Sequence, residues 1–176
     1  MKTILRRTLL TAAIALAAAP AFAQPGDSPF TQTIFFGDSL TDGGFFRSLL
    51  PANVQSVTGQ FTTNPGFVWS QCLADYYDSN ANVAWKSTGA TPLLADGNNW
   101  AVGGARVGTD SVGGLGYTPS LASQYARYLS SGHTVDPNAL YTVWGGANDL
   151  FAVQANPSQA NAIIGGRTRK RIDRAY

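Results

Sequence analysis

The chain has 176 residues, enough for one domain with a substantial core, and its formal net charge of +2 conceals an acidic body. Eight of the 12 basic residues lie near the two ends, whereas residues 24–164 carry four basic residues against nine Asp, a net charge of −5. Such a body, rich in Gly, Asn, Ser and Thr, argues against a nucleic-acid-binding surface. No uncharged apolar run reaches the ~18 residues that a membrane-spanning helix needs.

The first 23 residues have the three parts of a secretory signal peptide in the usual order. A positively charged start is followed by an apolar stretch from Leu9 to Ala19 and by the small-residue cleavage site Ala21-Phe22-Ala23. We therefore expect residues 1–23 to be a Sec-type signal peptide. The mature protein would begin near Gln24 and be exported to the periplasm, the cell surface or the medium. An N-terminal amphipathic helix is the alternative.

The apolar run Thr33–Phe36 predicts the first strand, which ends at Gly37. A polar, glycine-rich loop through Gly44 follows. Phe45–Leu50 then predicts a short helical turn, which Pro51 stops.

Between residues 66 and 77, apolar side chains recur every three to four residues, which predicts an amphipathic helix. Asn64 is its expected N-cap and Pro65 its first helical residue. The side chains expected to face the core are Phe67, Val68, Cys72, Leu73, Tyr76 and Tyr77. As the sole cysteine, Cys72 cannot form an intrachain disulfide, and its apolar neighbours favour a buried, inert thiol over a catalytic one.

Two further strands and a helix are expected in the middle of the chain. Val83–Trp85 predicts a short strand, and Asn99–Val102 predicts another, which ends at Gly103-Gly104. Residues 106–117 contain four glycines and are expected to form a flexible loop. Pro119–Ser130 predicts a helix, whose expected core-facing residues are Leu121, Tyr125, Tyr128 and Leu129.

The continuous apolar run Ala139–Trp144 predicts a strand that again ends at paired glycines, and Pro157–Ile164 predicts the start of another helix. Strands that alternate with helices in this way predict an α/β fold with a parallel sheet. The last twelve residues, 165–176, break the pattern with a strongly basic composition. We interpret them either as an unnatural end, such as a frameshift or a premature stop, or as a basic tail for an anionic surface.

Three glycine-bearing loops carry residues suited to acyl transfer. Loops after neighbouring parallel strands meet at one edge of the sheet, where ligands bind in open α/β folds. Ser39 supplies a hydroxyl nucleophile, and the N–H groups of Gly103-Gly104 and the Asn148 amide can donate hydrogen bonds to an oxyanion. Taken singly, each has an ordinary structural interpretation: an N-cap at Ser39, a chain reversal at the glycines and an Asx-turn at Asn148.

In these three blocks the chain resembles the GDSL esterases/lipases of the SGNH hydrolase superfamily, in particular exported, autotransporter-type bacterial members. The blocks are Phe36-Gly37-Asp38-Ser39-Leu40-Thr41-Asp42, Asn99-Trp100-Ala101-Val102-Gly103-Gly104-Ala105 and Gly145-Gly146-Ala147-Asn148-Asp149. The resemblance implies a three-layer, flavodoxin-like SGNH hydrolase fold. It also implies Ser39 as the nucleophile and as an oxyanion-hole N–H donor, with Gly104 and Asn148 as the other donors. Gly103 is the alternative to Gly104.

The family's Asp-x-x-His block, which supplies the base and its orienting residue, does not occur in this sequence. The single histidine, His133, precedes the last strand and is interpreted as a solvated loop residue. Residues 24–164 therefore resemble the N-terminal part of such a hydrolase domain, with a sheet expected to be incomplete at the C-terminus. We expect a truncated serine-type carboxylic-ester hydrolase with little or no activity.

The expected substrate is a small-molecule ester or a lipid, with no cofactor, no metal and no nucleic-acid partner. Association with the outer membrane is expected only of full-length relatives. The alternative is a secreted, non-catalytic module that binds acyl or glycan groups. A third interpretation is a surface protein whose basic residues Arg167 to Arg174 contact anionic lipid or lipopolysaccharide.

Overall fold

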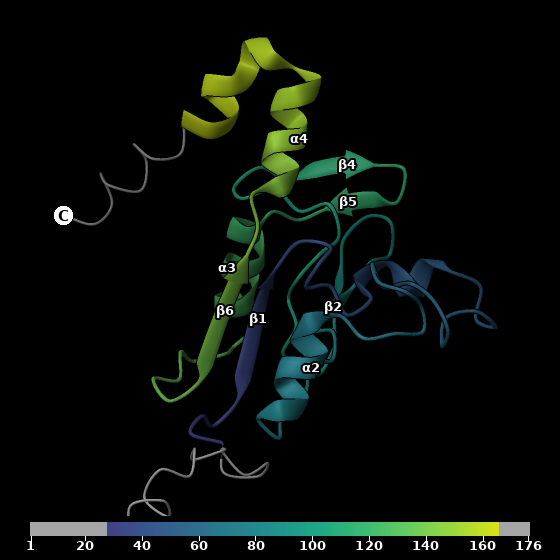
Figure 1. Cartoon of the computed structure of the whole chain (residues 1–176), viewed down its shortest axis with the longest axis vertical. Helices are drawn as coiled ribbons and strands as arrows, with labels where there is room; N and C mark the ends of the chain where they lie inside the picture. The colour runs from purple at the N-terminus through teal and green to yellow at the C-terminus, as the bar shows by residue number, and fades with distance from the viewer. Residues whose placement is uncertain (1–27, 166–176) are drawn as a thin grey trace, which may run out of the picture.

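The computed structural model describes residues 28–165 of the chain. The expected signal peptide, residues 1–23, lies outside the described residues, as does the expected basic tail beyond Gly165. Figure 1 shows a sheet flanked by helices, with a further helical segment beyond one end of the sheet. None of the helices within the described range is long and apolar enough to cross a membrane.

The sheet is built around β1 (Thr33–Gly37), which pairs in parallel with β6 (Leu140–Trp144). Both strands were predicted, and β1 includes one residue more than expected. On the other edge of β1, residues 98–102 run beside it, because Trp100 N–H donates to Phe35 O at 2.8 Å and Val102 N–H donates to Gly37 O at 3.0 Å.

The predicted strand Asn99–Val102 is regular only at Asn99, which forms parallel bridges with Phe35 and Val83. The side chain of Asn99 explains the interruption. Its Oδ1 accepts the Ala101 N–H at 3.0 Å, so this N–H is turned toward a local partner instead of a neighbouring strand.

Helices cover the two faces of β1. Ile34 and Phe36 lie in the larger core cluster, on the face covered by α3 (Leu121–Ser130), whereas Phe35 packs on the opposite face against α2 (Trp69–Tyr76). Successive side chains of a strand point to opposite faces, so β1 is buried on both. The result is the three-layer α/β arrangement that was expected.

Helix α2 begins at Trp69, not at Pro65 as predicted. The Asn64 side chain does not cap it, because its Nδ2 donates to Gln60 O at 2.8 Å and closes the preceding loop. Gln71 takes over at this end of the helix, where its Oε1 accepts the Val68 N–H at 3.0 Å.

The buried face of α2 also differs from the prediction. Its buried residues are Ser70 and Ala74, while Tyr76 is 52% exposed and Cys72 is exposed. The expectation of a buried Cys72 thiol was therefore wrong. Two small side chains let the helix lie close to the sheet, which turns the larger residues at positions 72 and 76 outward.

Helix α3 was predicted within two residues, with a different inner face. Ser120 caps it, since its Oγ accepts the Ser123 N–H at 3.3 Å. Tyr125 and Leu129, both expected in the core, are 52% and 43% exposed. The buried residues are Leu121, Gln124 and Tyr128.

The short helix η1 (Phe45–Leu49) was predicted. Of two hairpins, the first was expected only as a short strand at Val83–Trp85, and the second was not predicted. One joins β2 (Trp85–Lys86) to β3 (Leu93–Leu94), and the other joins β4 (Ser111–Gly113) to β5 (Gly116–Thr118). The second hairpin occupies the region expected to be a flexible glycine-rich loop. Its register is set by the turn at Gly113 and Gly116 and not by an apolar pattern.

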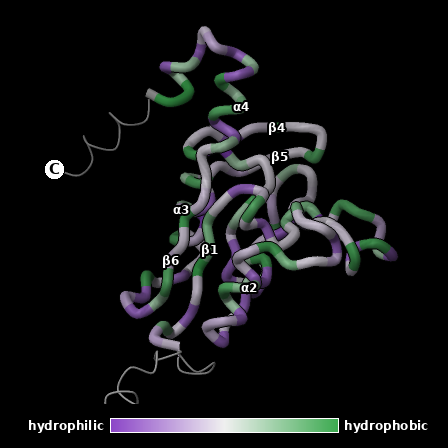
Figure 2. The backbone as a smooth tube through the Cα atoms, viewed as in Figure 1, coloured by the Kyte–Doolittle hydropathy of each residue, from purple (hydrophilic) through white to green (hydrophobic). Residues whose placement is uncertain are grey.

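After β6 the chain forms α4 (Ala147–Ala155), which was not predicted. It continues into the short turns η2 (Pro157–Gln159) and η3 (Asn161–Gly165), in place of the single helix expected from Pro157. Leu150 and Phe151 of α4 are 62% and 64% exposed, so α4 lacks the buried apolar stripe on which the prediction of a helix relies. Figure 2 shows hydrophobic residues in this outlying segment.

Candidate active site

Hydrogen bonds tie together the three loops that follow the sheet segments. Asp38 N–H donates to Trp144 O at 3.1 Å, which joins the loop after β1 to the end of β6. Gly103 N–H donates to Asp42 Oδ2 at 2.7 Å, and Asn148 Nδ2 donates to Ala105 O at 2.9 Å. The middle loop is therefore bonded to both of the others at the carboxyl edge of the sheet.

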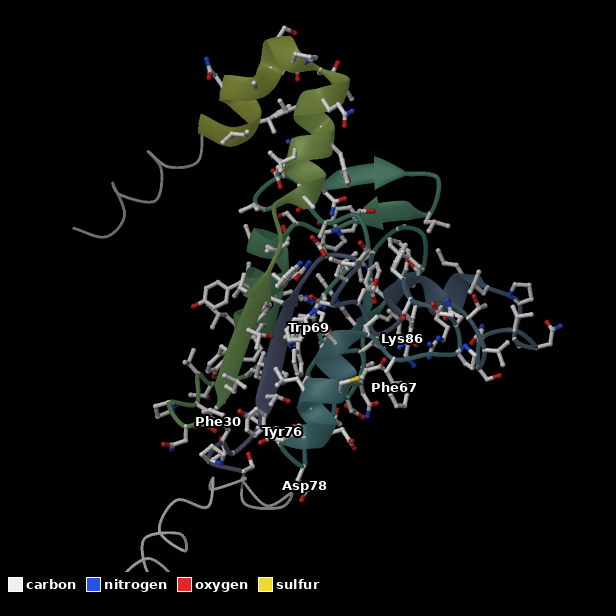
Figure 3. The ribbon with its side chains drawn as sticks, in the orientation of Figure 1. Phe30, Phe67, Trp69, Tyr76, Asp78 and Lys86 are labelled. Carbon is white, nitrogen blue, oxygen red and sulfur yellow. The ribbon has the colours of Figure 1, made fainter. Side chains whose placement is uncertain are left out.

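The loop after β1 is fixed at Thr41. The Thr41 carbonyl accepts hydrogen bonds from Ser70 Oγ at 2.8 Å and from Asn99 Nδ2 at 2.7 Å. Trp69 Nε1 donates to Thr41 Oγ1 at 3.2 Å, and Figure 3 shows the Trp69 side chain between α2 and β1. Helix α2 and the second block thus hold the segment that carries Ser39.

Asp42 is a buried carboxylate that organises this edge of the sheet. Its Oδ1 accepts N–H groups of Gly44 and Phe45, each at 2.7 Å, and its Oδ2 accepts that of Gly103. Burial raises the pKa of Asp42 to about 6, although the three N–H donors and the charge of Arg47 oppose the shift. The carboxylate clamps the first loop to the second.

Ser39 follows Asp38 in the turn after β1 and is half-buried. Asp38 is buried, and burial raises its pKa while the Leu40 N–H, which its Oδ1 accepts at 3.1 Å, opposes the rise. Among residues 28–165, neither the hydroxyl nor the backbone N–H of Ser39 has a hydrogen-bond partner. Both groups are available to a ligand.

The two glycines of the middle loop have different surroundings. Gly103 is buried, its N–H is bonded to Asp42, and an added Cβ would overlap the ring of Phe61. Gly104 is exposed, has φ of +79° and has open space around an added Cβ apart from Thr118 at 3.7 Å. The Gly104 N–H has no acceptor within the described part of the chain.

The first turn of α4 fastens the third loop. Besides the bond from Asn148 to Ala105, Asp149 Oδ2 accepts the Val107 N–H at 2.8 Å, and Asp149 Oδ1 lies 3.6 Å from Arg106 Nε. One N–H of the Asn148 amide is used by Ala105 O, which orients the side chain. The second N–H has no partner among residues 28–165.

His133 lies in the loop before β6, at the opposite end of that strand from Trp144, and it is exposed as expected. Its Nδ1 lies 2.8 Å from Ser131 Oγ, and its ring packs against Tyr128 with the ring centroids 5.0 Å apart. Because the loops that carry Ser39 and Asn148 follow the other ends of β1 and β6, His133 does not belong to the same edge of the sheet. Within the described range, no three His, Cys, Asp or Glu side chains gather as metal ligands.

Sequence reasoning missed the side chains that position these loops. Asp42 and Asp149 stand inside the quoted blocks, but their contacts lie 61 and 42 residues away. Gln124 was missed because it is polar. Gln124 lies three residues after Leu121 and four residues before Tyr128. This helical spacing was the available signal that all three share one face of the helix.

Gln124 bonds both backbone groups of the last residue of β1. Gly37 N–H donates to Gln124 Oε1 at 2.9 Å, and Gln124 Nε2 donates to Gly37 O at 2.8 Å. Helix α3 thereby fixes the strand end that precedes Asp38 and Ser39.

Comparison with known proteins gives consistent matches. Residues 34–173 match the family described as GDSL-like Lipase/Acylhydrolase. An uncharacterized protein in the trpE-trpG intergenic region of Pseudomonas putida is 35% identical over 93% of this chain and 28% of that protein. Esterase EstA of Pseudomonas aeruginosa is 31% identical over 81% of this chain and 26% of its own length, and Lipase 1 of Photorhabdus luminescens is 26% identical over 77% and 18%.

The chain thus spans about a quarter of the length of the first two of these relatives. The family match covers β1 from its second residue, all three glycine-bearing loops and β6. It agrees with the expected SGNH hydrolase fold and with the parallel pairing of β1 and β6. The chain belongs to the GDSL-like lipase/acylhydrolase family.

Proposed function

We propose that this chain carries the nucleophile and the oxyanion hole of a serine-type carboxylic-ester hydrolase. Ser39 attacks the ester carbonyl, and the N–H groups of Ser39 and Gly104 and the amide of Asn148 stabilise the oxyanion. The observation that carries this proposal is the bonding of three loops into one edge of the sheet, with unpaired donors on each. Relatives named as an esterase and a lipase support an ester or lipid substrate.

Support for Gly104 over Gly103 comes from how their N–H groups are used. The Gly103 N–H already donates to Asp42 at 2.7 Å, so it has no capacity for substrate. Gly104 has an exposed backbone and an unpaired N–H, and its φ of +79° suits glycine. Each oxyanion donor contributes about 3–4 kcal/mol to transition-state stabilisation.

Support for Asn148 comes from its anchored amide. The bond to Ala105 O at 2.9 Å fixes the side chain, and a fixed donor needs no reorganisation when charge develops on the substrate. The helix start at Ala147 places this amide at the N-terminal end of α4, whose dipole favours negative charge.

Within residues 28–165, no histidine lies at the proposed site to accept the proton of Ser39. No Asp-x-x-His occurs, and His133 lies at the other end of β6. A serine hydroxyl without a base is a weak nucleophile, and binding and oxyanion stabilisation alone leave about a 10³–10⁴-fold acceleration over water. We therefore propose that this polypeptide by itself turns over esters slowly.

Hydrolysis of p-nitrophenyl acetate by residues 24–176 tests the proposal, with and without added imidazole as an external base. We expect slow release of p-nitrophenol that imidazole accelerates beyond its own background, and loss of this increment in Ser39→Ala. His133→Ala is the matched control and should behave as the parent protein.

The outcomes separate the alternatives. If Ser39→Ala changes nothing at any imidazole concentration, Ser39 is not a nucleophile, and a non-catalytic acyl- or glycan-binding module becomes the better description. Fast, Ser39-dependent turnover without imidazole would support Ser39 as the nucleophile but contradict the proposal that the site lacks a base.

We also propose that the protein is exported after cleavage at Ala23. The support is the ordered signal-peptide pattern of residues 1–23. N-terminal sequencing of the mature protein from a bacterial host should give Gln24 as the first residue. A mature chain that retains Lys2 would contradict export by this route.

A further inference from the structure

A polar cleft of about 420 Å³ lies beside the segment that follows the first block, between η1, β2 and the residues near Val83. Its polar lining includes Arg47, Gln55, Gln71, Asn82, Lys86 and Asp96. Neither Ser39, Gly104 nor Asn148 lines it. The volume is within the range of small-molecule sites, but the lining differs from that of an acyl-chain pocket because it is mostly polar.

The cleft contains two basic side chains, a residue type that is scarce in the body of this protein. Residues 24–164 contain four basic side chains, and two of them, Arg47 and Lys86, line this one cleft. Arg106 pairs with Asp149. Within residues 28–165, neither Arg47 nor Lys86 has a carboxylate in ion-pair contact, although Asp96 lines the same cleft. Arg47 also acts electrostatically on the buried Asp42 carboxylate, but two cations that line one cleft of an acidic body favour a ligand that brings negative charge.

The Arg47 side chain is held in place. Its Nε donates to Thr58 O at 3.0 Å, and its guanidinium lies over Gly44, where an added Cβ would be 3.1 Å from Nε. The guanidinium has this space because Gly44 has no Cβ, and its φ of +121° also favours glycine. The terminal N–H groups of Arg47 have no partner within the described part of the chain, and a guanidinium fork matches the geometry of carboxylate and phosphate oxygens.

Lys86 is the last residue of β2, and the next residue, Ser87, is hydrogen-bonded to η1, which carries Arg47. Ser87 N–H donates to Phe45 O at 3.0 Å, and Ser48 Oγ donates to Ser87 O at 2.6 Å. Figure 3 shows Lys86 on the far side of α2 from β1. Because Ser87 is bonded to η1 through both its N–H and its carbonyl, the backbone that carries Lys86 is held beside the helix that carries Arg47.

We propose that this cleft binds a small polar molecule that carries one carboxylate or phosphate group. Arg47 and Lys86 hold the anionic group, and the amides of Gln55 and Asn82 hold neutral hydroxyls. Asp96 accepts hydroxyl donors and disfavours a ligand with several negative charges. This site is separate from the proposed ester-hydrolase site, since no proposed catalytic residue lines it.

Calorimetric titration of the purified chain at constant ionic strength tests the proposal, with glucose 6-phosphate, gluconate and glucose as probes. We expect saturable one-to-one binding of the phosphate or the carboxylate probe, which identifies the preferred anion, and none of glucose. Lys86→Gln and Arg47→Gln should each weaken binding about tenfold or more, because each removes charge-assisted hydrogen bonds.

Arg127→Gln is the matched control, since Arg127 is a basic residue of α3 that does not line the cleft, and it should leave the affinity unchanged. Absence of saturable binding by both charged probes overturns the proposal. So does an equal loss in Arg127→Gln, which would indicate a nonspecific charge effect. If Arg47→Gln unfolds, Lys86→Gln decides alone, because the exposed Lys86 side chain makes no bond that the fold needs.

Discussion

Replacing Asp42 by Asn should remove a pH-dependent contribution to the stability of the fold. Burial raises the pKa of Asp42 from its ordinary value of 3.8 to about 6 in the folded protein. The folded state then binds the proton more tightly than the unfolded state. Asp42 therefore contributes most stability below pH 3.8, and this contribution is lost as the pH rises to about 6 and stays constant above it.

The expected size follows from the shift. About two pKa units, at roughly 1.4 kcal/mol each, correspond to about 3 kcal/mol. Asn cannot titrate, so the comparison uses the difference between the unfolding free energies of the parent protein and of Asp42→Asn. This difference, parent minus variant, should fall by about this amount between pH 4 and pH 7. Other titrating groups, Asp38 among them, are present in both proteins and largely cancel in the difference.

Urea unfolding followed by the fluorescence of the four Trp residues, repeated across this pH range at constant ionic strength, measures that difference. A difference that rises with pH would refute the reasoning. It would mean that the three backbone N–H donors stabilise the Asp42 carboxylate more than burial destabilises it.

Three further experiments test the packing around the site. Gln124→Leu should lower the free energy of unfolding by about 1–3 kcal/mol, because it leaves the buried Gly37 N–H unpaired; an unchanged urea midpoint would contradict this. Cys72 should react with one equivalent of a thiol reagent such as DTNB in the native protein, whereas protection until unfolding would show that α2 faces the other way. Gly103→Ala should cost about 1–3 kcal/mol by overlap with Phe61, and Phe61→Ala should restore part of that loss in a double-mutant cycle.

The strands and the glycine loops could be predicted because their signals are local. Thr33–Phe36 and Ala139–Trp144 are uninterrupted apolar runs that end at glycine, and the structure has strands at both. Pro119 and Ser120 mark the start of α3, where Ser120 is the N-cap. The apolar pattern misled where an exposed surface is also apolar, as at Tyr125 and Leu129 of α3.

The inner faces of the helices could not be predicted, because they depend on the partner surface. Gln124 is buried where Tyr125 was expected, since its amide meets both backbone groups of Gly37, 87 residues away. Ser70 is buried for the same kind of reason, as its hydroxyl donates to Thr41 O. The backbone groups of Gly37 and Thr41 that these side chains bind are distant in the sequence, so the residues around Gln124 and Ser70 give no sign of them.

By itself the sequence determined strands β1 and β6, the glycine loops that follow them, helix α3 and the residue types that stand in those loops. Only the tertiary structure decided that Asp42 and Asn148 fasten the middle loop, that Gly104 and not Gly103 keeps an unpaired N–H, and that Arg47 and Lys86 share a cleft. The physical reason is that backbone conformation follows from neighbouring residues, whereas a buried hydrogen bond or a shared charge needs segments that are distant in the sequence and adjacent in the fold.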